Sequence, residues 1–419
     1  MTGPIALIGG RVICPATGHD GIATILLKDR KVFGIGPIGT SPEPPADAMI
    51  VDARGLVVAP GIIDAGVFKA DTAAANAGGI TRMVLMPDQS PPLDEPALVA
   101  YAQGSGKPDV WVHPLAAATR GLAGTELAEI GLAQAAGAVG VATGRHAIAD
   151  ARVMHRLLAY AGAFGLTVVS HAEDAALTAG AVATAGEYAT RLGLAAAPAF
   201  AESLAITRDC RLAQATGAAL HIRQVTTAEG LAAVAAARAR GVDVTAGITP
   251  AHLYLNDMAV SGFRSFARLS PPLRDERDRL ATIEGVRAGI ITILSSGHDP
   301  QSQEDKRQPF AEARAGMAGA ETLLALGLGL VRDSVITLPQ LVAMLSLNPA
   351  RRFGLVAGTL QLGAPADIMA FDEAAPWRID GDQFHGAGNT PFNGLPTAGR
   401  VRMTIKGGEI VWKDGVWRA

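Results

Sequence analysis

The stretch Val58-Ala59-Pro60-Gly61-Ile62-Ile63-Asp64 marks the point where the pattern of the chain changes. Before it, short apolar runs are separated by Gly, Pro and Asp turns, and residues 367–413 have the same pattern. Runs of this kind predict short β-strands. After it, strand-sized apolar runs alternate with Ala-rich amphipathic segments, of which residues 150–163, 228–240 and 275–288 are the clearest predicted helices.

Repeated strand-then-helix units with apolar strands predict an α/β fold with a parallel sheet covered on both faces. Residues 58–354 have room for eight such units, the usual size of a (β/α)₈ TIM-like barrel. Residues 1–57 and 355–419 flank this span. We expect these β-rich ends to meet in space as one small β-sandwich domain.

Composition excludes several classes of protein. The 419 residues are 49% hydrophobic and 18% charged, which is unlike a disordered chain. The net charge of −3 gives no basic excess for nucleic acid. Two cysteines, Cys14 and Cys210, are too few for a disulfide framework. There is no apolar run of membrane length and no secretion signal, so we expect a cytoplasmic protein.

Further sequence blocks follow the opening stretch down nearly the whole chain. They are residues 77–81 (AGGIT) with 86–87 (MP), 170–174 (SHAED), 221–227 (HIRQVTT), 248–253 (ITPAHL), 271–274 (PPLR), 348–351 (NPAR) and 389–392 (NTPF). Each block alone is a weak signal. In number and order, however, they resemble the amidohydrolase superfamily, and within it the dihydroorotases.

The resemblance implies a specific chemistry. In that family a barrel holds one or two divalent metals at the C-terminal ends of its strands, and the metal makes hydroxide near neutral pH. A carboxylate moves the proton during cyclic amide chemistry. The metal ligands are a His-x-His pair on the first strand, a bridging acidic residue, two single histidines and a final Asp.

The matching positions of this chain hold few such ligands. They are Gly66, Phe68, Thr143 with Gly144, His171, Gln224 and Gly297, so that only His171 is kept. Ala70 replaces the family's substrate-binding arginine, and Asp88 replaces an Asn. One imidazole and one amide do not compensate a zinc ion for its lost hydration, and Gly297 has no side chain to act as a base. We therefore predict no catalytic residue, no metal ligand set and no cofactor, with the Phe68 ring filling the gap.

The remaining polar residues of the blocks predict a vestigial pocket. Its members are His171, Gln224, His252, His298, Arg274 and Asn389. We expect structural hydrogen bonds at these positions rather than direct chemistry.

The leading hypothesis is a catalytically silent dihydroorotase homologue. The resemblance implies a partner as well, because some bacteria pair such a chain with aspartate carbamoyltransferase, which needs it as a non-catalytic scaffold. The resemblance further implies a homodimer. Two alternatives stay open. One is an active zinc-dependent dihydroorotase or related cyclic amidase, with a reorganised site around His171, His252 and His298. The other is a metal-free ligand sensor using Arg274 and Asn389, although Ala70 argues against a carboxylate ligand.

Overall fold

In the computed structural model, which describes residues 3–36 and 43–417, eight parallel strands form the central sheet. The prediction that the N-terminal segment holds no secretion signal includes Met1 and Thr2, which lie outside the described residues. The strands are β6 (Ile62–Val67), β7 (Ile80–Leu85), β8 (Trp111–Ala117), β9 (Gly140–Ala142), β10 (Thr167–Ser170), β13 (Leu220–Ile222), β14 (Val244–Ile248) and β15 (Ile291–Leu294). Each pairs with the next in parallel. Every residue of β6, β7 and β10 is buried, as expected for strands covered on both faces.

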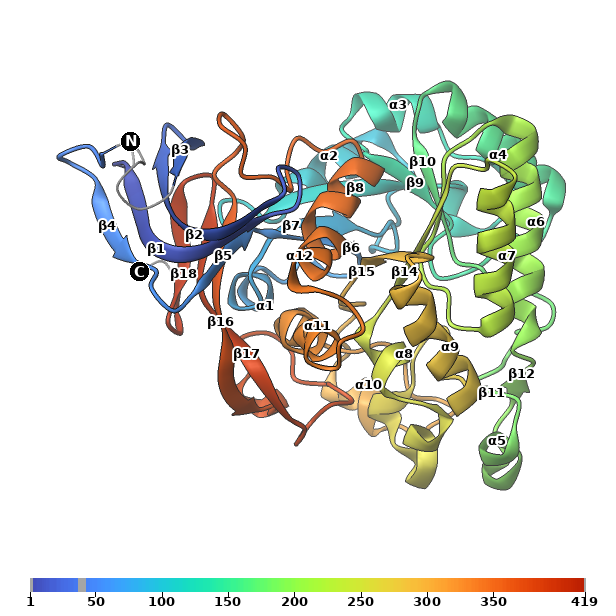
Figure 1. The fold of residues 1–419 in the computed structure, drawn as a ribbon. Coiled ribbons are helices and arrows are strands. Elements are labelled where there is room, and N and C mark those ends of the chain that lie inside the picture. Colours follow the sequence, from blue (N-terminus) through green and yellow to red (C-terminus); the bar gives the residue numbers. More distant parts are fainter. Residues whose placement is uncertain (1–2, 37–42, 418–419) are drawn as a thin grey trace.

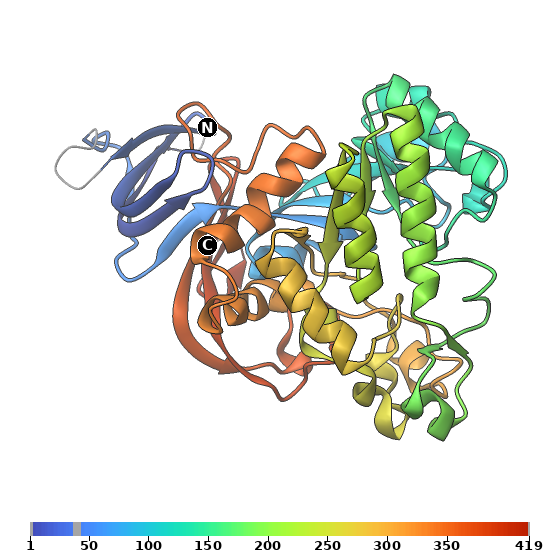
Figure 2. The same ribbon diagram turned by 45° about the vertical axis from the view of Figure 1, so that its right-hand side comes forward.

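Helices surround these strands (Figures 1 and 2). They are α1 (Thr72–Ala77), α2 (Pro96–Gly104), α3 (Ile130–Ala135), α4 (Ala151–Ala163), α6 (Phe200–Thr216), α7 (Ala228–Ala239), α9 (Glu276–Arg287) and α11 (Leu323–Arg332). The three helices predicted most clearly, α4, α7 and α9, are confirmed. Each begins just after a residue whose side chain accepts a backbone N–H, namely Asp150, Thr227 and Asp275. Such N-caps satisfy amides that the first helical turn leaves without partners.

The barrel is nearly closed. Strands β6 and β15 stand at the two ends of the strand order and do not pair directly. Instead, the backbone N–H of Phe68 donates to the carbonyl of His298 at 2.9 Å. Buried Asp64 accepts the Ser296 N–H at 2.8 Å and also the Ser296 hydroxyl. These contacts join the first and last strands, so the predicted (β/α)₈ fold is confirmed.

A second sheet of nine strands is built from both ends of the chain (Figure 1, blue and red). Its strands are β1 (Ile5–Cys14), β2 (His19–Lys28), β3 (Lys31–Gly36), β4 (Met49–Asp52), β5 (Val57–Pro60), β16 (Ile368–Arg378), β17 (Pro396–Lys406), β18 (Glu409–Lys413) and β19 (Val416–Trp417). The two groups expected to form a small sandwich are continuous, because β5 pairs with both β1 and β16. The domain bounds at residues 57 and 354 stay a prediction.

Gly61 lies where the chain passes from this sheet into the barrel. It separates β5 from β6, and a Cβ at this position would lie 2.3 Å from Oγ1 of Thr81. Only glycine allows so close an approach of neighbouring strands. The stretch from Val58 to Asp64 thus holds the end of β5, in the nine-stranded sheet, and the start of β6, in the barrel.

A buried ion pair joins the barrel to the second sheet. Arg82, on β7, lies 2.6 Å from the carboxylate of Asp367, just before β16. The Trp111 indole N–H donates to the same carboxylate at 3.2 Å, and the ammonium of Lys406 lies 3.6 Å from the centroid of that indole ring. These contacts fix the position of the second sheet against β7 and β8.

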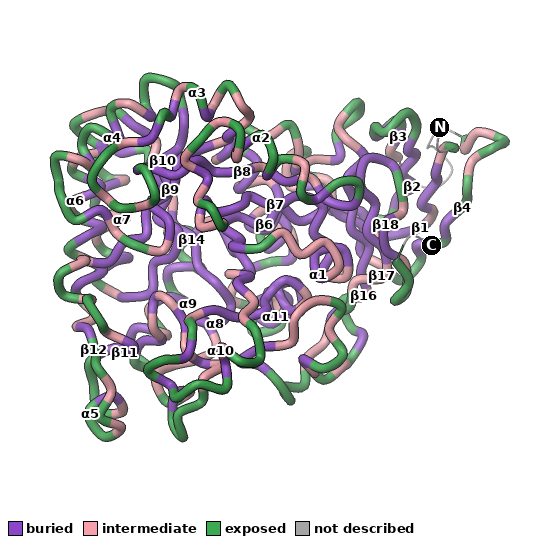
Figure 3. Tube along the Cα trace, turned by 180° about the vertical axis from the view of Figure 1, so that it is seen from behind, coloured by how far each residue is buried: buried purple, intermediate pink, exposed green. Residues whose placement is uncertain are grey.

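The remaining segments connect these elements. They include β11 (Ala183–Thr184), α5 (Glu187–Leu192), β12 (Ala196–Ala197), α8 (Pro250–Tyr254), α10 (Gln303–Arg307), α12 (Leu338–Val342) and α13 (Asn348–Arg352). Figure 3 shows buried strands at the centre of the molecule and exposed turns around them. No helix in the described ranges has the length and apolar character needed to cross a bilayer.

Candidate functional site

The C-terminal end of β6 offers no ligand at the first predicted position. Gly66 has a φ of +91°, which favours glycine. A Cβ at this position would lie 3.6 Å from both Cγ and Cδ of Arg223. Arg223 follows β13, so its side chain crosses the barrel mouth toward β6. The space beside Gly66 therefore holds the stem of an arginine.

Phe68 lies at the same mouth, against two guanidinium groups. The Cζ of Arg145 is 4.0 Å from the centroid of the Phe68 ring, and that of Arg223 is 5.2 Å away. The ring is only 8% exposed. A cation over an aromatic face is attracted by the negative charge of that face, so the three side chains form one packed unit. We call Phe68, Arg145 and Arg223 the mouth cluster.

Acidic side chains hold Arg145 in place. Asp299 accepts two hydrogen bonds from its guanidinium, one of them at 2.8 Å. Asp88 accepts the Arg145 backbone N–H at 2.8 Å. Burial raises the pKa of Asp88, while the charges of Arg145 and Arg223 lower it. Gly144, beside Thr143, has a φ of +82°, and a Cβ at this position would lie 2.9 Å from Asp88 Oδ1. The carboxylate of Asp88, which follows β7, thus lies beside Thr143 and Gly144, where the bridging acid was expected after β9.

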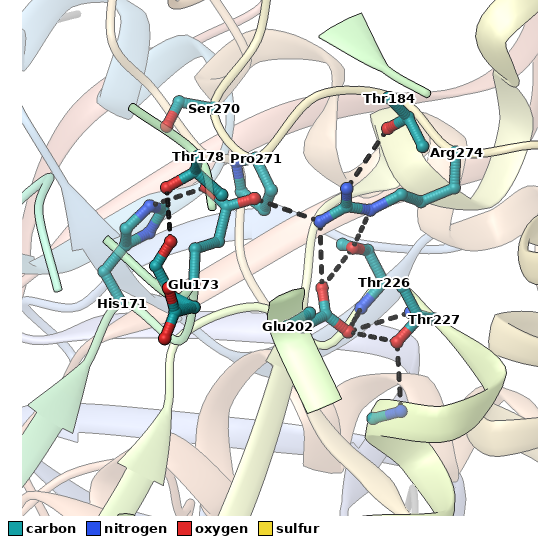
Figure 4. A network of polar contacts seen from close by, with 12 residues as sticks. His171, Glu173, Thr178, Thr184, Glu202, Thr226, Thr227, Ser270, Pro271 and Arg274 are labelled. Atoms are coloured by element: carbon teal, nitrogen blue, oxygen red, sulfur yellow. Dashed lines mark hydrogen bonds and ion pairs between the residues drawn. The ribbon is translucent and has the colours of Figure 1, made fainter. Parts of the chain in front are cut away.

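His171, the one retained ligand type, has both ring nitrogens engaged. Its Nδ1 is 2.9 Å from Nη2 of Arg223. Its Nε2 is 3.1 Å from Oε2 of Glu173, and Figure 4 shows these two residues side by side. A guanidinium N–H can only donate, so Nδ1 accepts and Nε2 carries the proton that it donates to Glu173. Burial lowers the pKa of His171, against the raising effect of Glu173. The imidazole is therefore neutral, and its single available lone pair points at Arg223.

Gln224 and His252 belong to one hydrogen-bonded chain. Gln224 donates to Oγ1 of Thr249 at 3.3 Å, and that oxygen is 2.8 Å from Nδ1 of His252. His252 Nε2 donates to the Pro271 carbonyl at 3.0 Å. When the hydrogen bonds run from Gln224 through Thr249 and His252 to Pro271, every donor in the series has an acceptor. Burial lowers the pKa of His252 to about 4. This series of hydrogen bonds holds the loop at Pro271 through a neutral imidazole. As in His171, both ring nitrogens of His252 have hydrogen-bond partners.

The expected position of the catalytic base is filled by neighbouring side chains. Gly297 has a φ of +62°, and a Cβ at this position would lie 2.8 Å from Cγ2 of Thr249. The next residue, His298, accepts two backbone N–H groups at Nδ1, both at 3.3 Å. Its Nε2 lies 3.8 Å from the carboxylate of Asp71, the N-cap of α1. An Asp at Gly297 has no room in this arrangement.

Arg274 is at the centre of a buried network (Figure 4). Its guanidinium donates to Thr226 at 2.9 Å, Thr184 at 3.1 Å, Glu173 at 3.1 Å and Glu202 at 3.4 Å. Burial raises the pKa of Glu173, but its hydrogen bond to His171 and the charge of Arg274 bring it down to about 2. Burial raises the pKa of Glu202, which also accepts the N–H groups of Thr226 and Thr227. Arg274 is thus the shared counter-ion of two buried carboxylates.

The side chain of Asn389 hydrogen-bonds backbone groups of two loops near the barrel mouth. Its side-chain oxygen accepts the Gln301 N–H at 3.1 Å, and its Nδ2 donates to the Gly316 carbonyl at 3.3 Å. Ala70, at the position of the family's arginine, is half-buried and packs against the main core. Neither Asn389 nor Ala70 therefore gives evidence of a ligand-binding site.

The mouth leaves little free space. Between Phe68, Arg223, His252 and Gly297 lies a cavity of about 30 Å³. A water molecule takes about 30 Å³ in the liquid. A larger cavity of about 460 Å³ lies outside it, lined by Arg145, His171, Arg268 and Arg314 among others. Arg145, Leu269 and Ser270 line both cavities and lie between them.

The structure brings together His171, Gln224, His252 and Arg274 around the mouth, while Asn389 lies in a supporting loop. Sequence reasoning assigned no role to Arg223 or Arg145, although both stand within or beside matched positions. One sequence feature could have indicated Arg223. In the block 221–227 this long cationic side chain comes directly before Gln224, which stands where a metal-binding histidine was expected.

Comparisons with known proteins identify the class. The chain matches the amidohydrolase family over residues 78–411. It is 39% identical to a dihydroorotase of Anaeromyxobacter sp. (strain K), covering 99% of each chain. It is 36% identical to a dihydroorotase-like protein of Pseudomonas aeruginosa, covering 97% of this chain and 99% of that one. The solved L-hydantoinase (dihydropyrimidinase) from Arthrobacter aurescens has a TM-score of 0.88 at 25% identity, covering 100% of this chain and 98% of that one. The chain belongs to the amidohydrolase family. Within it, this is a dihydroorotase-like chain of the cyclic-amidase type.

The comparisons contradict the sequence-based prediction that no cofactor is used. Amidohydrolases of the dihydroorotase kind are typically metal-dependent, so membership of the family overturns that prediction. The side chains at the family's ligand positions nevertheless do not fit a divalent ion. Within residues 3–36 and 43–417 no three His, Cys, Asp or Glu side chains gather as a metal site, and the His171 lone pair faces a guanidinium. A cation would have to displace Arg223 to reach that nitrogen.

Proposed function

We propose that this dihydroorotase-like chain is catalytically silent and acts in the cytoplasm as the non-catalytic scaffold subunit of aspartate carbamoyltransferase. One observation supports the proposal most directly. The Arg223 guanidinium hydrogen-bonds the only free lone pair of His171 at 2.9 Å, inside the closed mouth. The side chain that would serve catalysis is thereby used for packing.

Hydrolysis of a cyclic amide needs a group that activates water, a group that moves a proton, and space for the ring. Two carboxylates near the mouth are bound elsewhere: Asp299 by Arg145, and Glu173 by His171 and Arg274. The inner cavity of about 30 Å³ has room for about one water molecule and none for a substrate ring. These features support loss of the hydrolytic reaction in this chain.

A retained barrel with a filled mouth favours a role that depends on shape. Arg274, Glu173 and Glu202 form a fully buried and well-connected polar network, which fixes the strand ends in one arrangement. The partner itself is proposed from the sequence resemblance, as is a homodimer of this chain. We expect the transferase to contact a surface that remains outside the barrel mouth.

The experiment is co-expression of this chain with the aspartate carbamoyltransferase chain of the same organism, followed by size-exclusion chromatography. The proposal predicts a joint peak and a higher melting temperature for the transferase in the complex. As a matched control, an active dihydroorotase of another organism should not co-elute. Separate elution with no change in transferase stability would contradict the scaffold role.

A second candidate, an active dihydroorotase, is favoured by the names of the relatives, including one at 39% identity over nearly the full length. It requires Arg223 to leave His171 and the mouth to open. Stoichiometric metal in the purified chain, together with turnover of dihydroorotate, would establish this candidate in place of the first.

A further inference from the structure

The outer cavity has the size of a small-molecule site. Its volume is about 460 Å³, within the range of about 300–1,000 Å³ typical of ligand pockets. Arg145, His146, Arg268, Ser270, Gln301 and Arg314 contribute polar groups to its wall. Of the mouth cluster only Arg145 lines this cavity, where it lies between the cavity and the Phe68 ring.

Two of these cations have no counter-ion. Among the residues that the structure describes, neither Arg268 nor Arg314 forms a salt bridge, and the buried Nε of Arg268 has no hydrogen-bond acceptor. Burial lowers the pKa of Arg268 with no carboxylate acting against it. The acidic groups nearby are already paired: both oxygens of Glu173 are engaged, and Asp299 binds Arg145. Of the cavity's lining, only exposed Glu312 adds a further carboxylate.

The backbones of the two arginines are also held in fixed positions, although the side chain of Arg314 is exposed. Lys306 is 4% exposed, and its ammonium donates to the carbonyls of Arg314 at 2.8 Å, Ser265 at 3.1 Å and Arg268 at 3.4 Å. The Gly316 N–H donates to the same Arg268 carbonyl at 3.0 Å. One buried cation thus ties the backbones of both arginines together. A wall fixed before binding reduces the entropy that a ligand must overcome.

We infer that the outer cavity binds a small molecule bearing an oxyanion, either carboxylate or phosphate, through Arg268 and Arg314. Guanidinium forks match both groups, and a bound oxyanion would supply the acceptor that the buried Nε of Arg268 lacks. The site differs from the family's carboxylate contact, whose position holds Ala70. It does not depend on the proposed silence, because binding is measured on the isolated chain without any assay of turnover.

The test is isothermal titration calorimetry of the full chain with inorganic phosphate and, separately, with malonate, at constant ionic strength set with chloride. At least one probe should bind saturably at a stoichiometry of one. Arg268→Gln and Arg314→Gln should each weaken that binding by roughly tenfold. The control Arg287→Gln alters an exposed, salt-bridged arginine on α9, away from the cavity, and should leave affinity unchanged.

The two probes distinguish the kinds of ligand. Binding of phosphate alone supports a phosphorylated ligand, and binding of malonate alone or of both supports a carboxylate. The inference is overturned if neither probe binds saturably up to about 10 mM, or if both arginine variants bind as tightly as the unmodified chain. Circular dichroism of each variant shows whether it is folded. Within the described residues neither guanidinium makes a hydrogen bond or ion pair that the fold would lose, so both variants should fold.

Discussion

Replacing Arg274 with methionine removes the shared counter-ion of two buried carboxylates. Arg274 is 3% exposed and donates hydrogen bonds to Glu173 and Glu202, which both stay buried when its charge is lost. Removing one partner of a buried ion pair costs about 3–5 kcal/mol, because the remaining charges have no compensation. The free energy of unfolding should fall by that amount at pH 7.

Urea denaturation followed by circular dichroism measures the loss. The deficit should shrink as pH falls from 7 to 5, because the uncompensated carboxylates of the variant then take up protons. Adding Glu202→Gln to Arg274→Met should recover about 1 kcal/mol or more. Arg277→Met, at an exposed position of α9, is the matched control and should change stability by less than about 0.5 kcal/mol. A loss below about 1 kcal/mol for Arg274→Met, or a deficit independent of pH, would refute this reasoning.

Three further predictions concern the mouth. The pKa of Glu173 is lowered from 4.5 to about 2, so its contribution of about 3 kcal/mol to the free energy of unfolding is complete above pH 4.5 and is lost as pH falls toward 2. Glu173→Gln should therefore flatten the dependence of stability on pH in that window. An unchanged slope would count against the network. ¹⁵N NMR should show His171 with its proton on Nε2 and with a pKa below that of a free imidazole, whereas an Nδ1–H signal would show that Arg223 does not occupy that lone pair. Gly297→Asp, which introduces the carboxylate that the sequence resemblance leads us to expect there, should cost about 2–4 kcal/mol in urea denaturation from positive φ and overlap with Thr249. A variant as stable as the parent would disprove the crowding.

The barrel was predictable because its signals are local. Apolar runs of strand length and capping residues such as Asp150 and Asp275 act within a few positions of each other, so the sequence shows them directly. The break at Gly61 was less visible. The sequence marks the stretch from Val58 to Asp64 as a change of pattern, but the contact with Thr81 in a neighbouring strand shows why glycine stands at the break.

The missing ligands could also be predicted, since a glycine at 66 or 297 has no side chain in any fold. What replaces them could not. Arg223 reaches Gly66 from the end of another strand, and Arg145 reaches Phe68 and Asp299 across 77 and 154 positions of sequence. The direction of a long flexible side chain depends on its packing partners, which sequence spacing does not give. The lack of a cofactor was inferred from the same residue types, and family membership contradicts it.

The most direct test of the account is a hydrolysis assay of the purified chain with dihydroorotate, carried out with and without added Zn²⁺. A mouth sealed by Arg223 and Phe68 predicts no turnover above the buffer rate under either condition. Turnover that depends on Zn²⁺ and disappears in His171→Ala would contradict the account, since it requires a reactive centre where the structure has a guanidinium.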